Sequence, residues 1–453
     1  MLKRKAYDKL LKWKRRSNGS TAMLVKGARG VGKTTLVEEF GRREYRSCLI
    51  IDFSQASTEV RQYFEEYSDN FDVLFLMLST YYRVELFERD TLVVFDEVQA
   101  YPRARGLVKY LVADGRYDYI ETGSLISIRQ NVRDINIPSE EEAMRLEPLD
   151  FEEFLWAMGE SQLFELIRTY FVQRKPIPDF LHRRAMRLLR EYVLVGGMPK
   201  PVSIYMERRA FAPVDGEKRR ILESYRNDVT RFAKGHESKV TSILDGIPGQ
   251  LSKREKKFTL ASVGKHARMR EYEESFFWLG EAHIANICYA AADPSAWLWR
   301  NLDKPAIKVY MADTGLLVTH AFPYSTEAGK EMYRAVLLGD LGINESMLTE
   351  NLVAQMLVAA GHRLFYYSQS GRRGDEERME IDFVVARPFD FAMGKPRVCP
   401  IEVKSPKQYG TTSLDRFKKK FGKGIECEVV LHAKQLRVEG DRLHLPLYMA
   451  GLL

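Results

Sequence analysis

Residues 27–34 read Gly-Ala-Arg-Gly-Val-Gly-Lys-Thr, a sequence that fits a phosphate-binding loop in both pattern and setting. The run at 21–26 predicts a short buried strand before the loop, and the run at 35–40 predicts the first turns of an amphipathic helix after it. The loop therefore joins a strand to a helix N-terminus, where backbone N–H groups and the helix dipole together attract phosphate. A Gly-rich turn without a ligand needs neither flank, so this segment predicts binding of a nucleoside triphosphate.

Different residues of this loop are expected to bind different parts of the nucleotide and its metal ion. The glycines let the backbone turn its N–H groups inward around the phosphates. Lys33 is expected to reach the β and γ phosphates, and the Thr34 hydroxyl to ligate Mg²⁺, so the predicted cofactors are ATP and Mg²⁺. The predicted nucleotide-binding residues are Gly27, Ala28, Arg29, Gly30, Val31, Gly32, Lys33, Thr34 and Thr35.

A second element makes hydrolysis a reasonable expectation. The apolar, β-branched run at 91–95 predicts a buried strand that ends in Asp96 and Glu97. Ligands of doubly wound sheets bind at the carboxyl ends of the strands. We therefore expect Asp96 to hold the Mg²⁺ shell and Glu97 to polarise the attacking water as general base. The alternative is a pair of ordinary turn acids, which the loop upstream disfavours.

Further residues at the same sheet edge have weaker signals. A third strand at 117–122 runs into Gly123 and Ser124, so Thr122 or Ser124 either senses the γ-phosphate or belongs to a simple turn. No arginine can be assigned as a finger from the sequence. The candidates that follow the nucleotide-edge strands are Arg103, Arg105 and Arg129.

Composition places the chain among globular proteins. Its 453 residues suffice for about three domains, and 45% of them are hydrophobic. No apolar run approaches the roughly 18–20 residues of a spanning helix, and no apolar signal core follows the basic N-terminus, so we expect a cytoplasmic protein without a membrane partner.

A net charge of +8 permits nucleic acid as a partner without requiring it. The four cysteines, which lack paired spacing and argue against a zinc site or a disulfide frame, are Cys48, Cys288, Cys399 and Cys427.

The order of predicted elements divides the chain into four parts. In residues 1–155, strands alternate with helices, which predicts an α/β domain with a mainly parallel sheet and helices on both faces. A last strand and a helix capped near Asp150 close this part, and a helical lid or linker is expected over 156–235.

The pattern in 236–325 is that of a winged helix, a common DNA-binding module. Helices are expected at 240–248, 258–263 and 271–279, and a β-ribbon begins near 284. Basic residues on one side of the module are typical of DNA binding, but they are also found on solvent-exposed faces and on protein-contact modules. The sequence therefore does not decide what this part of the chain binds. The basic residues are Lys253, Arg254, Lys256, Lys257, Lys265, Arg268 and Arg270.

The last part, 335–453, contains a second candidate catalytic site. Glu350 lies on a predicted helix, Asp382 on a predicted strand at 379–385, and Glu402 and Lys404 on one face of a predicted strand at 398–404. The two carboxylates and the lysine on these neighbouring strands can hold a hard divalent cation and stabilise a phosphodiester transition state. A salt-bridged sheet edge is the alternative, and the spacing fits both.

Taken in order, the motifs resemble those of the prokaryotic AAA-type ATPases that end in the domain of unknown function 4143. They are residues 27–34, Phe95-Asp-Glu-Val-Gln99, Thr122-Gly-Ser124, Pro148-Leu-Asp-Phe-Glu-Glu-Phe154, Val195-Gly-Gly-Met-Pro199, Met311-Ala-Asp-Thr-Gly-Leu-Leu317, Glu350-Asn351 and Ile401-Glu-Val-Lys-Ser405. The resemblance implies an ATPase core, a winged-helix middle and a C-terminal fold related to the PD-(D/E)XK nucleases. It assigns Asp382, Glu402 and Lys404 to the nuclease-type core, with Glu350 as its helix acid. Ile381 stands where the name motif of those nucleases has proline, a residue without a chemical role.

Two functions from different classes are consistent with this sequence. In the first, an ATP-hydrolysing enzyme couples its nucleotide state to DNA engagement, with metal-dependent cleavage by the C-terminal domain as an added activity. In the second, the chain is a nucleotide-gated switch whose C-terminal fold is an inactive scaffold for DNA or a protein partner. Assembly into a homo-oligomer is compatible with both.

Overall fold

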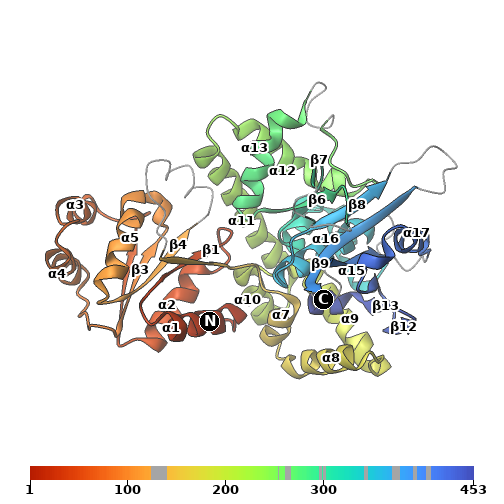
Figure 1. The fold of residues 1–453 in the computed structure, drawn as a ribbon, viewed down its shortest axis with the longest axis horizontal. Helices are drawn as coiled ribbons and strands as arrows, with labels where there is room; N and C mark the ends of the chain where they lie inside the picture. The colour runs from red at the N-terminus through yellow and green to blue at the C-terminus, as the bar shows by residue number, and fades with distance from the viewer. Residues whose placement is uncertain are drawn as a thin grey trace. The chain divides into compact units, whose positions relative to one another are not determined.

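The computed structural model describes residues 1–123, 140–253, 255–260, 267–294, 298, 302–340, 345–369, 378–390, 395–404 and 410–453 (Figure 1). These residues form two compact units. The first unit contains Met1–Glu147 and Glu281–His283, and the second contains Pro148–Gly280 and Ile284–Leu453. Four residues with predicted roles, Ser124, Arg129, Arg254 and Lys265, lie outside the described residues, as do residues 261–263 of the predicted helix at 258–263.

The first unit is built on a five-stranded sheet in the order β2-β3-β4-β1-β5, in which every neighbouring pair is parallel. The strands are β1 (Ala22–Lys26), β2 (Ser47–Asp52), β3 (Thr91–Asp96), β4 (Asp118–Gly123) and β5 (Glu141–Arg145). The predicted parallel α/β sheet is confirmed, because short buried runs with β-branched residues form strands covered on both faces.

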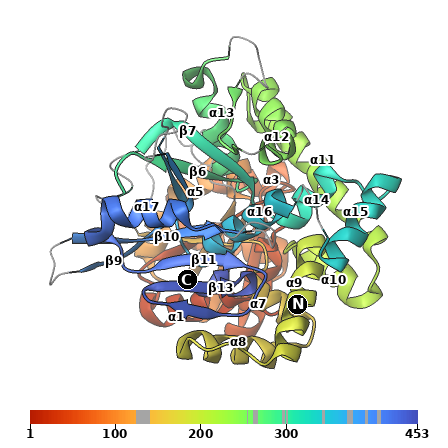
Figure 2. The ribbon, with the colours of Figure 1, turned by 90° about the vertical axis from the view of Figure 1, so that its right-hand side faces the viewer.

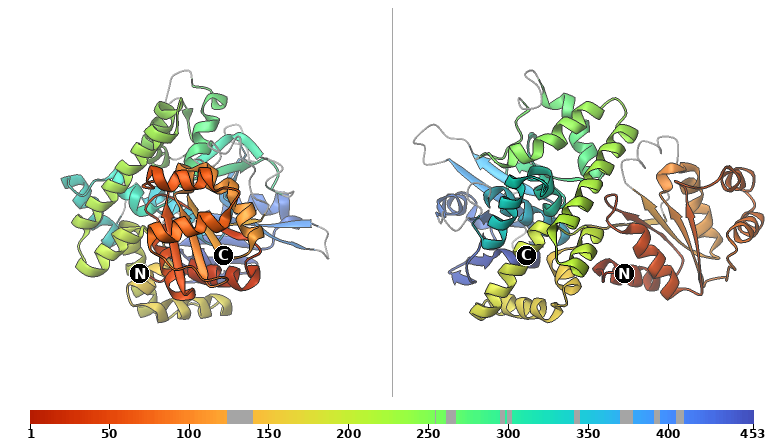
Figure 3. Two further views of the ribbon diagram at one scale, coloured as in Figure 1. Left: turned by 90° about the vertical axis from the view of Figure 1, so that its left-hand side faces the viewer. Right: turned by 180° about the vertical axis from the view of Figure 1, so that it is seen from behind.

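Helices cover this sheet, as Figure 3 shows. They are α1 (Lys5–Ser17), α2 (Lys33–Glu44), α3 (Thr58–Glu66), α4 (Phe71–Tyr82) and α5 (Pro102–Asp114). Side chains of α3, α4 and α5 share one apolar core with alternate strand residues such as Leu49, Ile51, Val93 and Phe95. Helix α2 packs against β2, β3 and β4 through its own buried residues, which include Leu36.

The second unit contains an eight-stranded sheet in the order β12-β13-β11-β10-β9-β8-β6-β7. The strands are β6 (Ala285–Ala291), β7 (Leu302–Met311), β8 (Phe365–Gln369), β9 (Met379–Asp390), β10 (Lys395–Val403), β11 (Glu428–His432), β12 (Arg437–Glu439) and β13 (Arg442–Pro446). Strand β10 runs antiparallel to β9 and parallel to β11, so a crossover separates β10 from β11.

The helices of the second unit surround this sheet. They are α7 (Phe151–Ala157), α8 (Ser161–Gln173), α9 (Asp179–Val195), α10 (Pro199–Arg208), α11 (Phe211–Phe232), α12 (Glu237–Leu251), α13 (Met269–Glu281), α14 (Thr314–Ala321), α15 (Glu327–Leu338), α16 (Glu345–Ala359) and α17 (Thr412–Phe421), the last of which lies beside β9 and β10 in Figure 2. The capping box of α7, formed by Asp150 and Glu153, confirms the helix start expected from the sequence. None of the helices in the described part of the chain combines the length and apolar character that a membrane crossing requires.

The expected β-ribbon is present, but it is not a free wing. Strands β6 and β7 form an antiparallel pair after α13, as the sequence predicts. However, β6 also pairs in parallel with β8, because its second edge finds backbone partners in the C-terminal part of the chain. The ribbon therefore extends the sheet that carries β9 and β10, and a single sheet spans the predicted boundary between residues 325 and 335.

Candidate nucleotide site and C-terminal carboxylate cluster

The backbone between β1 and α2 forms a tight loop with glycines at the positions that require them. Gly30 and Gly32 have φ of 78° and 92°, in the left-handed region that glycine adopts without steric cost. At Gly27, a Cβ atom would lie 2.4 Å from the carbonyl oxygen of Leu146, so a side chain there would collide with backbone. Helix α2 then begins at Lys33 with Gly32 as its N-cap.

The Lys33 ammonium lies inside this loop. It donates hydrogen bonds to the carbonyl oxygens of Gly27 (3.1 Å) and Ala28 (3.2 Å), and the residue is buried. Its charge is thus already placed at the concave side of the loop, where the phosphates of a nucleotide are expected. Arg29 and Thr35, by contrast, are exposed.

One supporting residue has no sequence signal in this loop. Arg4, which is buried, donates from Nη1 to the carbonyl of Val31 (3.1 Å) and from Nη2 to the carbonyl of Glu147 (2.6 Å). It therefore ties the phosphate-binding loop to the end of the first unit. A single arginine near the chain start gives no periodicity or motif from which this contact could be predicted.

The two predicted Mg²⁺-binding residues are in contact. Thr34 Oγ1 donates to the Asp96 carboxylate, at 2.8 Å from Oδ2 and 3.1 Å from Oδ1. Thr122, at the end of the adjacent strand β4, also donates its hydroxyl to Asp96. Burial raises the pKa of Asp96, and the hydrogen bonds from Thr122 and Thr34 counteract that rise. A hydroxyl and a carboxylate are oxygen donors that suit Mg²⁺.

The predicted general base follows directly in an uncommon backbone conformation. Glu97 has φ 51° and ψ 46°, the left-handed region, which a residue with a Cβ rarely occupies. Its N–H donates to Thr122 Oγ1 (3.2 Å), and the Gln99 amide donates to its carboxylate. Thr122 thereby contacts both acidic residues, which favours a role in the site over a simple turn.

The two arginine candidates among the described residues, Arg103 and Arg105, form ion pairs within the first unit. Arg105 is buried, with Nη2 at 2.8 Å from Glu141 and Nε at 3.4 Å from Glu121. Its guanidinium is therefore enclosed in an ion-pair cluster, and the prediction that Arg105 is a finger candidate is corrected. Arg103 is exposed and lies 3.2 Å from Glu65.

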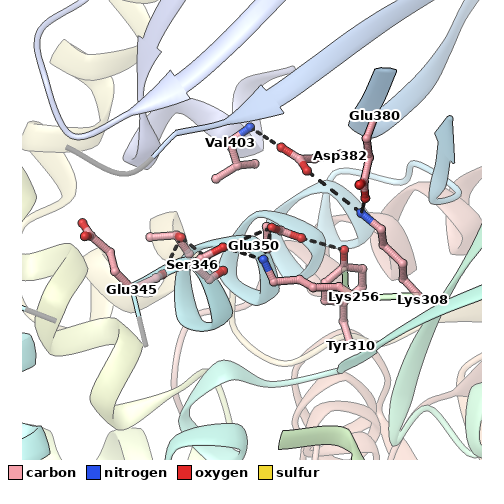
Figure 4. A network of polar contacts seen from close by, with 10 residues as sticks. Lys256, Lys308, Tyr310, Glu345, Ser346, Glu350, Glu380, Asp382 and Val403 are labelled. Atoms are coloured by element: carbon pink, nitrogen blue, oxygen red, sulfur yellow. Dashed lines mark hydrogen bonds and ion pairs between the residues drawn. The ribbon is translucent and has the colours of Figure 1, made fainter. Parts of the chain in front are cut away.

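In the second unit, Glu350 of α16 and Asp382 of β9 belong to one buried polar network (Figure 4). The Lys256 ammonium donates to Glu350 and to Ser346, and the Tyr310 hydroxyl donates to the second Glu350 oxygen (3.1 Å). The backbone N–H of Val403 donates to Asp382 Oδ2 (2.8 Å).

A second lysine completes this network. Lys308 of β7 is buried, and its ammonium lies 2.8 Å from Glu380 and 4.0 Å from Asp382. Burial raises the pKa of Asp382 to about 7, with a further contribution from the negative charge of Glu350. Burial would also raise the pKa of Glu350, but Lys256 and Lys308 hold it below its usual range. The ammonium groups thus supply the positive charge that keeps Glu350 ionised.

Glu402 and Lys404 of the same predicted core form a separate pair. Lys404 Nζ lies 2.8 Å from Glu402, as their position on one strand face predicts. The charges that act most on the pKa of Glu402 are those of Lys404, Arg442 and Asp415, whereas Glu350, Lys308 and Lys256 act on Asp382.

The predicted metal site stays a prediction. Across the described ranges, no cluster of three or more His, Cys, Asp or Glu side chains is arranged to hold a metal ion. The antiparallel ladder of β9 and β10 pairs Phe383 with Ile401 and so puts Asp382 opposite Glu402, while Lys256 and Lys308 supply counter-charge to Glu350 and Asp382. Lys308 has a sequence signal for this role, because it stands in the apolar run 305–311, whereas the sequence predicts Lys256 on a basic surface.

Three protein-family models match parts of the chain. The family model of the AAA domain matches residues 19–155, a domain of unknown function (DUF8612) matches 186–326, and the domain of unknown function 4143 matches 345–449. No curated protein matches the chain.

Solved structures give weak matches. They include Drosophila ORC bound to DNA (13% identity, 67% of this chain and 90% of that chain, TM-score 0.28) and the Aeropyrum pernix ORC1 protein in complex with DNA (12%, 75% and 93%, 0.26). For C. elegans PCH-2 the values are 16%, 37% and 47%, with a TM-score of 0.21, so this chain spans less than half the length of that one. TM-scores this low support no inference about function. The family models, together with the parallel-sheet unit and its phosphate-binding loop, show that the chain combines an N-terminal AAA domain with a C-terminal domain of unknown function 4143, as in the ATPases that its motifs resemble.

Proposed function

We propose that this protein binds ATP with Mg²⁺ in its first unit and hydrolyses it slowly to control its engagement of DNA. The observation that carries the proposal is the meeting of Lys33, Thr34, Asp96, Glu97 and Thr122 at the carboxyl ends of β1, β3 and β4. These residues supply a phosphate-binding lysine, oxygen ligands for Mg²⁺ and a general base for phosphoryl transfer to water.

The residues have distinct tasks in this mechanism. The inward N–H groups of the loop and the start of α2 bind the phosphates, and Lys33 exchanges its carbonyl partners Gly27 and Ala28 for phosphate oxygens. Thr34 and Asp96 would hold Mg²⁺, which neutralises charge that develops on the phosphates. Glu97 accepts a proton from the attacking water. Thr122, bonded to Asp96 and to the Glu97 N–H, links the metal side of the site to the base.

The ATPase proposal is tested with Lys33→Ala. Loss of the ammonium should abolish ATP binding or hydrolysis, measured by calorimetry and by phosphate release. Lys109→Ala, on the exposed side of α5, is the matched control and should behave as wild type. Undiminished hydrolysis by Lys33→Ala would contradict the assignment of the site.

DNA engagement is proposed from exposed basic residues of the second unit. Lys253, Lys257, Arg268 and Arg270 are exposed, and α17 ends in three exposed lysines at 418–420. Lys256, which the sequence placed in the same basic set, is buried against Glu350 and is removed from it. Contacts of this kind release counterions from phosphates, so binding should weaken steeply with salt. Fluorescence anisotropy with duplex and single-stranded DNA tests this, and absence of binding at ~50 mM salt, a permissive condition, would refute it.

For the C-terminal domain, the observations favour the switch with an inactive nuclease-like scaffold over a cleaving enzyme. Lys256 and Lys308 neutralise Glu350 and Asp382 from within the protein, which reduces the need for a divalent cation. A cleavage assay distinguishes the two functions. It uses plasmid and single-stranded DNA with Mg²⁺ or Mn²⁺, with and without ATP. Absence of cleavage in all arms supports the scaffold. Cleavage that disappears in both Asp382→Ala and Lys404→Ala would instead establish a nuclease.

A further inference from the structure

Two cysteines that lie far apart in the sequence are neighbours in the second unit. Cys399 lies in β10, and Cys427 immediately precedes β11. Their Sγ atoms are 2.8 Å apart, and no disulfide joins them. Cys399 is buried, whereas Cys427 is partly exposed, so a solution reagent can reach one member of the pair.

The pairing of β10 with β11 and with the segment before β11 brings the two cysteines together. In the parallel ladder, Ile401 is opposite Val429, an offset of 28 residues (429 − 401), whereas the bridge between Val398 and Ile425 has an offset of 27 (425 − 398). Cys399 and Cys427 lie between these two pairings, where the offset changes by one residue. The Glu426 N–H donates to the carbonyl of Val398 (3.0 Å), which holds the two segments together at this point.

This placement also satisfies the requirements of a covalent bond. Adjacent strands lie about 4.8 Å apart. That separation falls within the roughly 4.4–6.8 Å between Cα atoms that a disulfide spans. The two Sγ atoms already face each other at 2.8 Å, compared with about 2.05 Å in a disulfide. A disulfide can therefore close here without a rearrangement of the strands.

We propose that Cys399 and Cys427 are a thiol–disulfide site that reacts with small-molecule disulfides such as oxidised glutathione. The Cys427 thiolate attacks one sulfur of the small disulfide, whose S–S bond breaks and releases one small thiol. The Cys399 thiolate then attacks Cys427 Sγ in the mixed disulfide, forms the protein disulfide and displaces the second small thiol. Two protein thiols are oxidised and one small disulfide is reduced to two thiols, which take up the two protons.

The other two cysteines differ from this pair and provide controls. Burial raises the pKa of the Cys48 thiol to about 12 and that of Cys288 above its ordinary value. Both therefore remain protonated near neutral pH, and the thiolate is the reactive form.

The bond would close a loop that contains α17. Leu414 and Phe417 of this helix pack in the core beneath the sheet, together with Val398 of β10. A bond from Cys399 to Cys427 would limit the separation of α17 from the sheet, since both ends of the crossover would be fixed. In a reducing compartment the pair would stay open and would close on oxidation.

The experiment equilibrates the full-length protein with a series of reduced and oxidised glutathione ratios, followed by alkylation and peptide mass mapping. We expect a cross-linked peptide pair joining Cys399 to Cys427, with Cys48 and Cys288 alkylated, and complete reversal by dithiothreitol. Oxidation should raise the melting temperature of wild type and of Cys48→Ser, but not of Cys427→Ser. Free thiols at 399 and 427 in the most oxidising mixture, or a glutathione adduct on Cys427 without the cross-link, would overturn the proposal.

Discussion

Thr34 Oγ1 lies 2.8 Å from Asp96 Oδ2, so the first turn of α2 and the end of β3 are joined by a hydrogen bond. A hydroxyl and a carboxylate at this separation can share one Mg²⁺ with only small side-chain movement. Because β3 is buried along its whole length, the Asp96 carboxylate has few other positions. The sheet therefore fixes the relative positions of the two residues that we propose as Mg²⁺ ligands.

We predict that Glu97→Gln retains ATP binding and loses turnover. Glutamine preserves the size of the side chain but cannot accept the proton of the attacking water. The expected fall in kcat is on the order of 10²–10⁴-fold, the usual contribution of a general base. Steady-state phosphate release and nucleotide titration measure the two quantities separately, and a wild-type rate in this variant would show that another group is the base.

Glu121→Gln is expected to change how the stability of the protein depends on pH. Burial, and then the charge of Glu141, raise the pKa of Glu121 above its ordinary value. The folded state therefore holds a proton that the unfolded state releases, so stability falls as pH rises above about 4.3, the usual pKa of a glutamate. Glutamine does not titrate, so the variant does not lose stability in this way as pH rises. Arg105 keeps its hydrogen bonds to Glu141 in the variant.

Melting temperatures over a pH series check this prediction. The difference between Glu121→Gln and wild type should widen as pH rises from acid to neutral. Glu88→Gln, at an exposed position, is the control and should follow wild type. A variant that loses stability in parallel with wild type would show that Glu121 is not the group responsible.

Lys256→Met should destabilise the second unit by about 3–5 kcal/mol, because it leaves the buried Glu350 carboxylate without its main counter-charge. The double variant with Glu350→Gln should recover most of this loss, since no buried charge is then left unpaired. Lys257→Met, at the exposed neighbouring position, should stay within about 0.5 kcal/mol of wild type. Denaturant unfolding of wild type, Lys256→Met, Glu350→Gln and the double variant gives the coupling energy, and additive effects would argue against the pair.

Gly315→Ala should destabilise the second unit by about 1–3 kcal/mol, the usual cost of overpacking. A Cβ atom at Gly315 would lie 2.5 Å from the backbone N of Gly196 and 2.6 Å from its Cα, atoms that cannot move aside independently. Gly216→Ala in α11 is the matched control with the opposite expectation, because an added Cβ atom at Gly216 would contact nothing within 4 Å. That change should stabilise the protein by up to about 1 kcal/mol through helix propensity. Thermal unfolding of the two variants should move in opposite directions.

The nucleotide site could be predicted from the sequence because its signals are local. Glycine spacing, the apolar run before Asp96 and the alternation of strands and helices each involve residues that are close in the chain. Parallel strands bring their carboxyl ends to one edge of a sheet whatever the rest of the fold does. Thr122 could be proposed on this basis, and the structure adds its two bonds to Asp96 and Glu97.

The charge pairing of the C-terminal site and the register of its sheet were decided only by tertiary structure. Lys256 and Glu350 are 94 residues apart, and no periodicity links a lysine of that segment to a helix acid. Arg105 likewise became an internal ion-pair partner instead of a surface arginine. Cys399 and Cys427 meet because β10 pairs with β11 and with the segment before it, although their spacing in the sequence predicts no bond. Such contacts depend on how strands and helices from distant parts of the chain are packed, whereas the phosphate-binding loop depends on eight consecutive residues at 27–34.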